Sequence, residues 1–221
     1  MIQVDDLSLD APDGRPLQQG LHLHLEPGGS LLLLGSGGCG KSQFLRVLAG
    51  TVPPRTGRVR IAGVQTWPGE GALALAGRVR TGFVFAQGGL LSNQTLRDNV
   101  ALPLRFAGTS PGETRARAEA ALERFGLLSV ADLRPHAVSA SQRKLANVAR
   151  VEALQPEVLL VDDPLEGVEA GDHARVIGWL RDWIQDAART LVVGLEEPGD
   201  FGDLPVRRLH LSPIAPAEEP R

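Results

Sequence analysis

The spacing of apolar residues divides this chain into a β-rich first third and a helix-rich middle. Residues 2–9 are strand-like, and residues 21–25 alternate leucine with histidine, which predicts a strand with its leucines on one face. Because no third ligand lies near the two histidines, we interpret them as a solvated strand face rather than a metal site. Residues 58–61 and 79–85 predict two further strands.

From residue 112 onward the apolar residues take a helical spacing that is interrupted by short continuous runs. Helices are predicted at residues 112–125, 139–154 and 172–189. Residues 158–161 and 191–193 are unbroken apolar runs, which are typical of strands buried on both faces of a parallel sheet.

Composition places the chain among ordinary globular proteins. Its 221 residues are 43% hydrophobic and 22% charged, with a net charge of −3, so a basic nucleic-acid surface is not expected. A single cysteine, Cys39, excludes an internal disulfide and fits a reducing cytosol. The first residues are acidic, unlike a signal peptide, and no apolar run reaches the roughly 20 residues of a membrane span. We therefore expect any membrane role to come through a partner.

The most informative segment follows the apolar run at residues 30–34. It reads, in order, Gly35, Ser36, Gly37, Gly38, Cys39, Gly40, Lys41 and Ser42. This is the phosphate-binding loop pattern G-x-x-x-x-G-K-[ST] between a strand and a helix. Backbone N–H groups of such a loop surround phosphate oxygens, Lys41 reaches the β- and γ-phosphates, and Ser42 offers a hydroxyl to Mg²⁺. The segment therefore predicts a nucleotide site.

Two motifs in the second half narrow the class of nucleotide protein. The strand at residues 158–161 ends in Asp162, which would hold Mg²⁺ through water opposite Ser42. Residues 138–144 start a helix, and Asp163 and a proline follow the acid. This order of motifs resembles the ATP-binding subunits of ABC transporters, whose signature loop reads Leu-Ser-Gly-Gly-Gln and whose acidic strand ends Asp-Glu-Pro.

The resemblance covers nearly the whole chain and implies further roles. Gln87 is similar to the Q-loop glutamine that senses Mg²⁺ and contacts the membrane subunit, so the implied metal set is Ser42, Gln87 and Asp162. Residues 166–169 match the D-loop position. Residues 88–104 are similar to the Mla phospholipid-transport ATPases, which implies lipid transport, and nearly as similar to ATPases of the cell-division and lipoprotein-release type. The resemblance also implies a signature loop that contacts the ATP of the opposite subunit, formed by Ser139, Ala140, Ser141 and Gln142.

Several catalytic positions depart from the family pattern. Asp163 stands at the catalytic glutamate position, and its side chain is one methylene shorter than that of glutamate. A carboxylate misplaced by about 1 Å costs on the order of 10²-fold in rate, so slow hydrolysis is expected. Glu196 stands where a histidine contacts the γ-phosphate, and a carboxylate about 4 Å from a phosphate oxygen costs roughly 4 kcal/mol at an effective dielectric constant of 20. Glu196 either swings away, serves as an alternative base, or has no catalytic part. Ala140 and Ser141 replace two glycines and add β-carbons where the backbone should approach a phosphate closely. The Ser141 hydroxyl would partly compensate by offering a hydrogen bond to that phosphate.

Two features bear on nucleotide affinity. Residues 9–12 lack the aromatic that the family stacks on adenine, and such stacking contributes about 1–3 kcal/mol, so weaker affinity is expected. Cys39 lies inside the phosphate loop, where it is either a redox-sensitive thiol or a small residue tolerated at a variable position.

These residues are compatible with three functions. The first is a working transport ATPase, in which two subunits sandwich two ATPs head to tail and drive a permease. The second is a degenerate subunit that binds ATP, hydrolyses it poorly and serves a structural or regulatory role. The third is an unrelated phosphate-loop enzyme such as a small-molecule kinase, against which the Ser139-to-Asp162 arrangement argues. A homodimer is favoured, because even an intact partner would leave no wholly intact site.

The resemblance implies an α/β fold with a phosphate-loop ATPase core, a mainly parallel sheet, an N-terminal antiparallel β region and an α-helical insertion. We expect one ABC-type ATP-binding domain at residues 1–212, a helical subdomain at about 92–150, and a disordered tail at 213–221. The implied cofactors are ATP and Mg²⁺. The implied partners are a second ATP-binding subunit and integral membrane permease subunits that dock near Gln87. The chain would then be a cytoplasmic, attenuated ATPase, peripheral on the inner face of the cell membrane.

Overall fold

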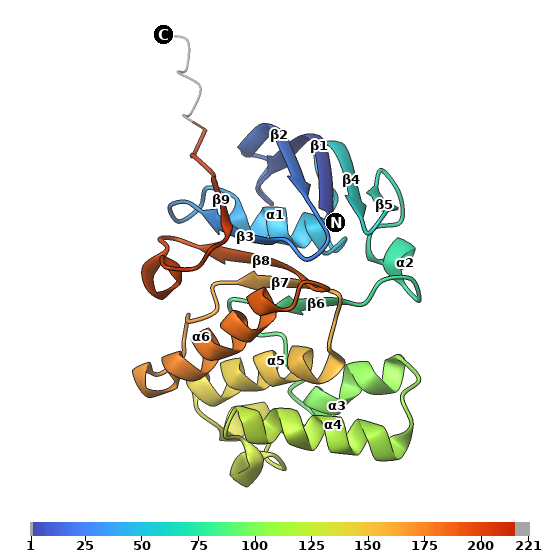
Figure 1. The fold of residues 1–221 in the computed structure, drawn as a ribbon, viewed down its shortest axis with the longest axis vertical. Coiled ribbons are helices and arrows are strands. Elements are labelled where there is room, and N and C mark those ends of the chain that lie inside the picture. Colours follow the sequence, from blue (N-terminus) through green and yellow to red (C-terminus); the bar gives the residue numbers. More distant parts are fainter. Residues whose placement is uncertain (1, 215–221) are drawn as a thin grey trace.

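The fold contains two β-sheets with one helix between them and further helices below the second sheet, as seen in a computed structural model that describes residues 2–214 (Figure 1). The predicted tail at residues 213–221 lies almost wholly outside the described residues. None of the helices within residues 2–214 is long and apolar enough to cross a membrane.

The first sheet is antiparallel and contains four strands in the order β2-β1-β4-β5. Their bounds are β1 Ile2–Asp10, β2 Pro16–Leu25, β4 Thr56–Ile61 and β5 Val64–Trp67. Strand β1 is central, because Val4 pairs with Leu23 of β2 on one side and with Val59 of β4 on the other. The leucines of β2 face the core and its histidines face solvent, as the alternation predicted.

The second sheet is parallel, and the phosphate loop follows its strand β3, next to the edge strand β9. Its strands follow the order β6-β7-β8-β3-β9, and every pairing is parallel. Their bounds are β3 Ser30–Leu34, β6 Thr81–Val84, β7 Val158–Asp162, β8 Thr190–Leu195 and β9 Arg207–His210. Since parallel strands end at the same edge, the segments that follow β3, β6, β7 and β8 meet there.

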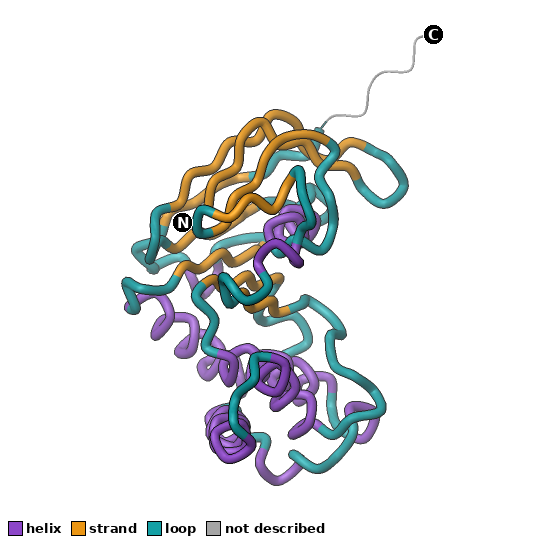
Figure 2. The backbone as a smooth tube through the Cα atoms, turned by 90° about the vertical axis from the view of Figure 1, so that its right-hand side faces the viewer, coloured by secondary structure: helices purple, strands orange, loops and turns teal. Residues whose placement is uncertain are grey.

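Helices cover both faces of the parallel sheet. Most of them lie on the face that is turned away from the antiparallel sheet (Figure 2). Their bounds are α1 Lys41–Leu48, α2 Ala72–Leu75, α3 Leu96–Phe106, α4 Pro111–Arg124, α5 Ala140–Leu154 and α6 Ala170–Gln185. Alternate residues of β3 enter different cores: Leu31 and Leu33 join α1 and the antiparallel sheet, whereas Leu32 and Leu34 join α3 to α6. The predicted α/β architecture with its helical insertion is thus confirmed.

Some predicted boundaries are wrong. The helix expected at 172–189 is α6, and it ends at Gln185, because the Asp186 carboxylate accepts the Ala188 N–H at 3.0 Å and diverts the backbone into a turn. The strand expected at 79–85 is shorter at both ends. Strands β5 and β9 and helix α2 were not predicted, since they are four residues long and carry weak periodicity. Helix α3 was expected only as part of the helical subdomain, without bounds of its own.

Candidate functional site

The phosphate loop turns from the carboxyl end of β3 into α1. Gly35 lies at this turn with a positive φ of 154°, and a β-carbon there would stand 2.4 Å from the carbonyl oxygen of Leu211, so only glycine fits. Gly40, with a φ of 105°, is the N-cap of α1, and the first turn of this helix has no side-chain cap. The free N–H groups of that turn are the donors that a phosphate would accept.

Lys41 and Ser42 begin α1 and orient toward the loop and toward β7. The Nζ of Lys41 donates to the carbonyl oxygens of Gly35 at 2.5 Å and Ser36 at 3.1 Å. The Ser42 hydroxyl donates to Oδ1 of Asp162 at 3.0 Å, across 120 residues of sequence. A hydroxyl beside a buried carboxylate is the kind of hard oxygen set that Mg²⁺ takes, so these residues fit the ion.

Cys39 is buried beneath the phosphate loop, with its Sγ 4.0 Å from the Nζ of Lys41. Its side chain is only 1% exposed and packs in the core between α1 and the antiparallel sheet. This placement supports the interpretation of a small residue at a variable position over that of a reactive thiol. Sequence reasoning missed Gln18, whose buried amide donates to the carbonyl oxygens of Cys39 at 2.9 Å and Ser212 at 2.7 Å and so braces the loop.

Asp163 follows β7 in a left-handed conformation with a φ of 40°. Its N–H donates to the carbonyl of Gly194 at 3.0 Å, which fixes the turn against β8. Burial, and then the charge of Glu166, raises the pKa of the Asp163 carboxyl above its ordinary value, while the nearby cation of Lys144 opposes that rise. A half-buried carboxyl on a strained backbone is typical of a functional position.

Glu196 reaches the phosphate loop itself. It follows the carboxyl end of β8, and its Oε1 accepts the backbone N–H of Gly37 at 2.8 Å. The carboxylate therefore takes one of the N–H donors that a phosphate-binding loop offers to an anion. Sequence reasoning placed Glu196 near the γ-phosphate, but it did not foresee a direct contact with the loop.

Gln87 lies beyond β6 and contacts the segment after β7. Its side-chain amide donates to Oε1 of Glu166 at 2.5 Å. Among the described residues it makes no hydrogen bond to Ser42 or Asp162, so the structure joins only two members of the implied metal set.

The signature residues form the start of α5. Ser139 is its N-cap: its hydroxyl accepts the Gln142 N–H at 3.2 Å, and the Gln142 side chain accepts the Ser139 N–H at 3.0 Å. Ala140 is exposed, but Ser141 is buried, and its hydroxyl donates to Asp172 at 3.4 Å and accepts the Glu169 N–H at 3.1 Å. In this structure that hydroxyl points inward, and the expectation that it compensates for a lost glycine stays a prediction.

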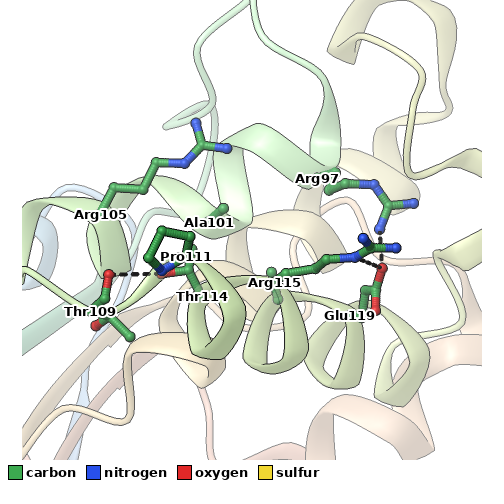
Figure 3. Close-up of a pocket in the computed structure, with 9 residues that line it drawn as sticks. Arg97, Ala101, Arg105, Thr109, Pro111, Thr114, Arg115 and Glu119 are labelled. Atoms are coloured by element: carbon green, nitrogen blue, oxygen red, sulfur yellow. Dashed lines mark hydrogen bonds and ion pairs between the residues drawn. The ribbon is translucent and has the colours of Figure 1, made fainter.

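A cavity lies elsewhere, on α3 and α4 (Figure 3). It encloses about 700 Å³ over a floor of small residues, and three arginines line it. Arg97 and Arg115 both contact Glu119, at 3.3 and 3.2 Å, and Arg105 contacts Asp98 at 2.9 Å. Arg97 also contacts Asp132 at 2.8 Å, so each of the three guanidinium groups has a carboxylate partner. A second cavity of about 520 Å³ adjoins Gln87 and α5.

Taken together, this fold and this edge of the sheet define a phosphate-loop nucleotide-binding protein. The sequence model of the ABC transporter family matches residues 18–166. An uncharacterized ABC transporter ATP-binding protein of Mycobacterium tuberculosis is 36% identical over 184 residues, covering 80% of this chain and 56% of its own. The methionine import ATP-binding protein MetN of Cereibacter sphaeroides is 33% identical, covering 82% and 52%. The chain thus spans about half the length of these two relatives.

Two further comparisons agree. The cell division ATP-binding protein FtsE of Escherichia coli is 34% identical over 164 residues, 74% of each chain. The solved dimer of the bacterial ABC transporter cassette MJ0796 superimposes with a TM-score of 0.86 at 25% identity, covering 96% of this chain and 94% of that one. The chain therefore belongs to the ABC transporter family, as an ATP-binding subunit.

Proposed function

We propose that this subunit binds Mg-ATP, dimerises around it, hydrolyses it slowly, and couples that cycle to a membrane permease. The observation that carries the proposal is the 3.0 Å hydrogen bond between Ser42 and Asp162 beside Lys41. It joins the phosphate loop and the acidic strand end at one edge of the parallel sheet, which is the arrangement that a metal-bound triphosphate needs.

Each residue of this edge has a distinct task in binding. The free N–H groups of the loop and of the first turn of α1 surround the phosphates. Lys41 exchanges the carbonyl oxygens of Gly35 and Ser36 for phosphate oxygens. Ser42 and Asp162 hold Mg²⁺, which neutralises phosphate charge when it is bound.

Slow hydrolysis is supported by the two carboxylates near the scissile bond. Asp163 is the candidate that orients or activates water, but it is short for this position, and its strained backbone leaves little freedom to approach. Glu196 must leave the Gly37 N–H before a triphosphate can use that donor. Both features slow turnover without removing any part of the phosphate cradle.

The same contact favours a second candidate, a degenerate ATP-binding subunit with a structural or regulatory role. A carboxylate on the loop stabilises the nucleotide-free state and so raises the ATP concentration needed for dimerisation. In that role ATP binding alone, rather than turnover, would be transmitted to a partner.

The partner side of the proposal rests on the Gln87 loop. The 520 Å³ cavity beside it has apolar residues such as Leu90 and Pro135 and the charged residues Arg143, Lys144 and Glu166 in its lining, a mixed surface on which a permease segment could dock. The subunit would thus lie on the inner face of the cell membrane through its permease, with Ser139 presented at the exposed start of α5 to a second copy. Lipid as the transported substrate stays a prediction from residues 88–104.

Mg-ATPase rate and nucleotide-dependent dimerisation of the purified chain test this function. We expect slow hydrolysis by the wild type, a rise in Asp163→Glu and in Glu196→His, and the largest rise in the double variant. Lys41→Ala is the control, because it keeps both carboxylates and loses the phosphate contact. An unchanged rate in the double variant would contradict the account of attenuation, and an absence of Mg-ATP binding would contradict the function itself.

A further inference from the structure

Helix α5 carries a polar stripe on a face that is otherwise buried. Lys144, Asn147 and Arg150 are spaced three residues apart, so they lie along one side of the helix. Lys144 is 6% exposed and Asn147 is fully buried, among neighbours that belong to the helical core. Burying such groups is unfavourable unless each one finds a hydrogen-bond partner.

Their partners are main-chain carbonyls of the loop that contains Gln87. Lys144 Nζ donates to Phe85 at 2.8 Å and Ala86 at 3.0 Å. Asn147 Nδ2 donates to the carbonyl of Gly88 at 3.1 Å, and Arg150 donates to that of Gly89. The stripe therefore holds residues 85–86 and 88–89, on both sides of Gln87, while the Gln87 side chain turns to Glu166.

The loop is shaped for this contact. Gly89 has a φ of 89°, and a β-carbon there would lie 3.0 Å from Asn147 Nδ2 and 2.7 Å from the Phe85 ring. Only glycine lets the backbone come close enough to the stripe in that conformation.

Lys144 also reaches the catalytic edge. Its Nζ donates to the carbonyl oxygen of Asp163 at 2.7 Å and lies 3.4 Å from that of Asp162. One ammonium group thus connects three segments: the signature helix, the loop after β6 and the turn after β7. The charged groups that face it are Asp162, Asp163 and Glu166, and burial lowers the pKa of Lys144 to about 8.

The choice of lysine here is informative. The chain has 21 arginines and only two lysines, Lys41 in the phosphate loop and Lys144. A compact ammonium donates to carbonyl oxygens in several directions, whereas the planar guanidinium directs its donors in one plane. Both lysines are found where main-chain carbonyls converge on one point.

We propose that Lys144 is a positioning residue, which fixes the Gln87 loop and the Asp163 turn relative to each other and to the signature helix. Asn147 and Arg150 add hydrogen bonds to the carbonyl oxygens of Gly88 and Gly89, further along the same loop. Displacement of the loop by a partner would therefore be transmitted to the main chain of Asp163. The consequence for catalysis rests on the proposed ATP hydrolysis, whereas the mechanical coupling does not.

Hydrogen–deuterium exchange measured by mass spectrometry tests the coupling directly. In Lys144→Met we expect amides of both residues 85–92 and 161–168 to exchange about tenfold faster or more, because both segments lose a donor. In Asn147→Leu only residues 85–92 should respond. Lys144→Gln keeps two N–H donors and should lie between wild type and Lys144→Met, which keeps the test decisive if Lys144→Met does not fold.

Thr66→Val is the matched control. It removes another buried hydrogen bond to a carbonyl, that of Val59 at 3.2 Å, in the antiparallel sheet far from the stripe, and it should leave both segments unchanged. Kinetically, Lys144→Met should lower kcat by about tenfold or more while the Kd for Mg-ATP changes by less than about threefold.

The outcomes separate the two proposals. If the wild type does not hydrolyse ATP, the proposed function fails while exchange still decides the coupling. Unchanged exchange at residues 161–168 in Lys144→Met, or an equal increase in Thr66→Val, would overturn the positioning role. So would a kcat in Lys144→Met equal to that of the wild type.

Discussion

At the scale of single residues, Glu196 is a side chain that contacts the phosphate loop directly. Its carboxylate accepts the Gly37 N–H at 2.8 Å, so it competes with a phosphate for a donor of the loop. It is exposed, which lets it leave, but a carboxylate that remained about 4 Å from a phosphate oxygen would cost roughly 4 kcal/mol at an effective dielectric constant of 20. Affinity therefore depends on where this side chain moves.

Glu196→Gln keeps the shape of the side chain and removes its charge. We expect the Kd for Mg-ATP to fall by about tenfold, equivalent to ~1.4 kcal/mol, since only part of the repulsion is felt after the side chain moves. Titration calorimetry with Mg-ATP measures the change. Glu197→Gln is the control, because Glu197 is exposed and next in sequence. Equal effects in the two variants would mean that long-range charge, and not the loop contact, sets the affinity.

At the scale of elements, α3 shows how the helical part is anchored beside the Gln87 loop. Asn99 is fully buried, its Oδ1 accepts the Leu91 N–H at 2.7 Å, and its Nδ2 donates to the carbonyl of Thr95 at 2.9 Å. Thr95 caps the helix by accepting the Asp98 N–H, and its hydroxyl donates to the Asp98 carboxylate at 2.8 Å. The start of α3 and the preceding segment thus form one hydrogen-bonded unit.

Thr95→Ala should lower the free energy of unfolding by about 1 kcal/mol, the usual value of an N-cap.

The hydrogen bond from Thr95, and then Arg105, holds the pKa of Asp98 below its ordinary value of 3.8. A carboxyl group whose pKa is lowered by folding stabilises the folded state at pH values above its unfolded-state pKa. This stabilisation is lost as the pH falls through the folded-state pKa of the same group. Urea unfolding between pH 3 and 7 should therefore show a weaker acid dependence in Asp98→Asn than in the wild type. An identical dependence in both would remove Asp98 as a cause of acid sensitivity.

At the scale of the whole molecule, the parallel sheet brings together segments that are distant in sequence. Strands β3, β6, β7 and β8 end at one edge, where the phosphate loop, Gln87, Asp162 and Glu196 follow them. The signature at the start of α5 is exposed at Ser139, so it is free to meet a second copy.

Asp163→Asn should trap the nucleotide-bound dimer. It removes the candidate catalytic carboxylate and keeps the phosphate cradle, so we expect the mass measured by light scattering to double with Mg-ATP and to remain that of one chain with Mg-ADP. Lys41→Ala should stay a monomer with either nucleotide. A monomer at saturating Mg-ATP in Asp163→Asn would contradict the homodimer.

Much of the fold was predictable because its strands and long helices carry strong patterns. The unbroken apolar runs at residues 158–161 and 191–193 became β7 and β8, and the glycine-rich motif fixed the turn between β3 and α1. Short edge elements such as β9, which pairs only with β3 in the parallel sheet, were missed, because its alternation extends over four residues. Helix ends were also missed where a side chain such as Asp186 competes for the backbone.

The sequence by itself determined the phosphate loop, the acidic strand end and the family, because each depends on residue type at a fixed local spacing. Only the tertiary structure decided the directions of side chains: Cys39 and Ser141 inward, Glu196 onto Gly37, and Lys144 among carbonyls of two segments. These directions depend on contacts between residues far apart in the chain, for which local spacing carries no signal.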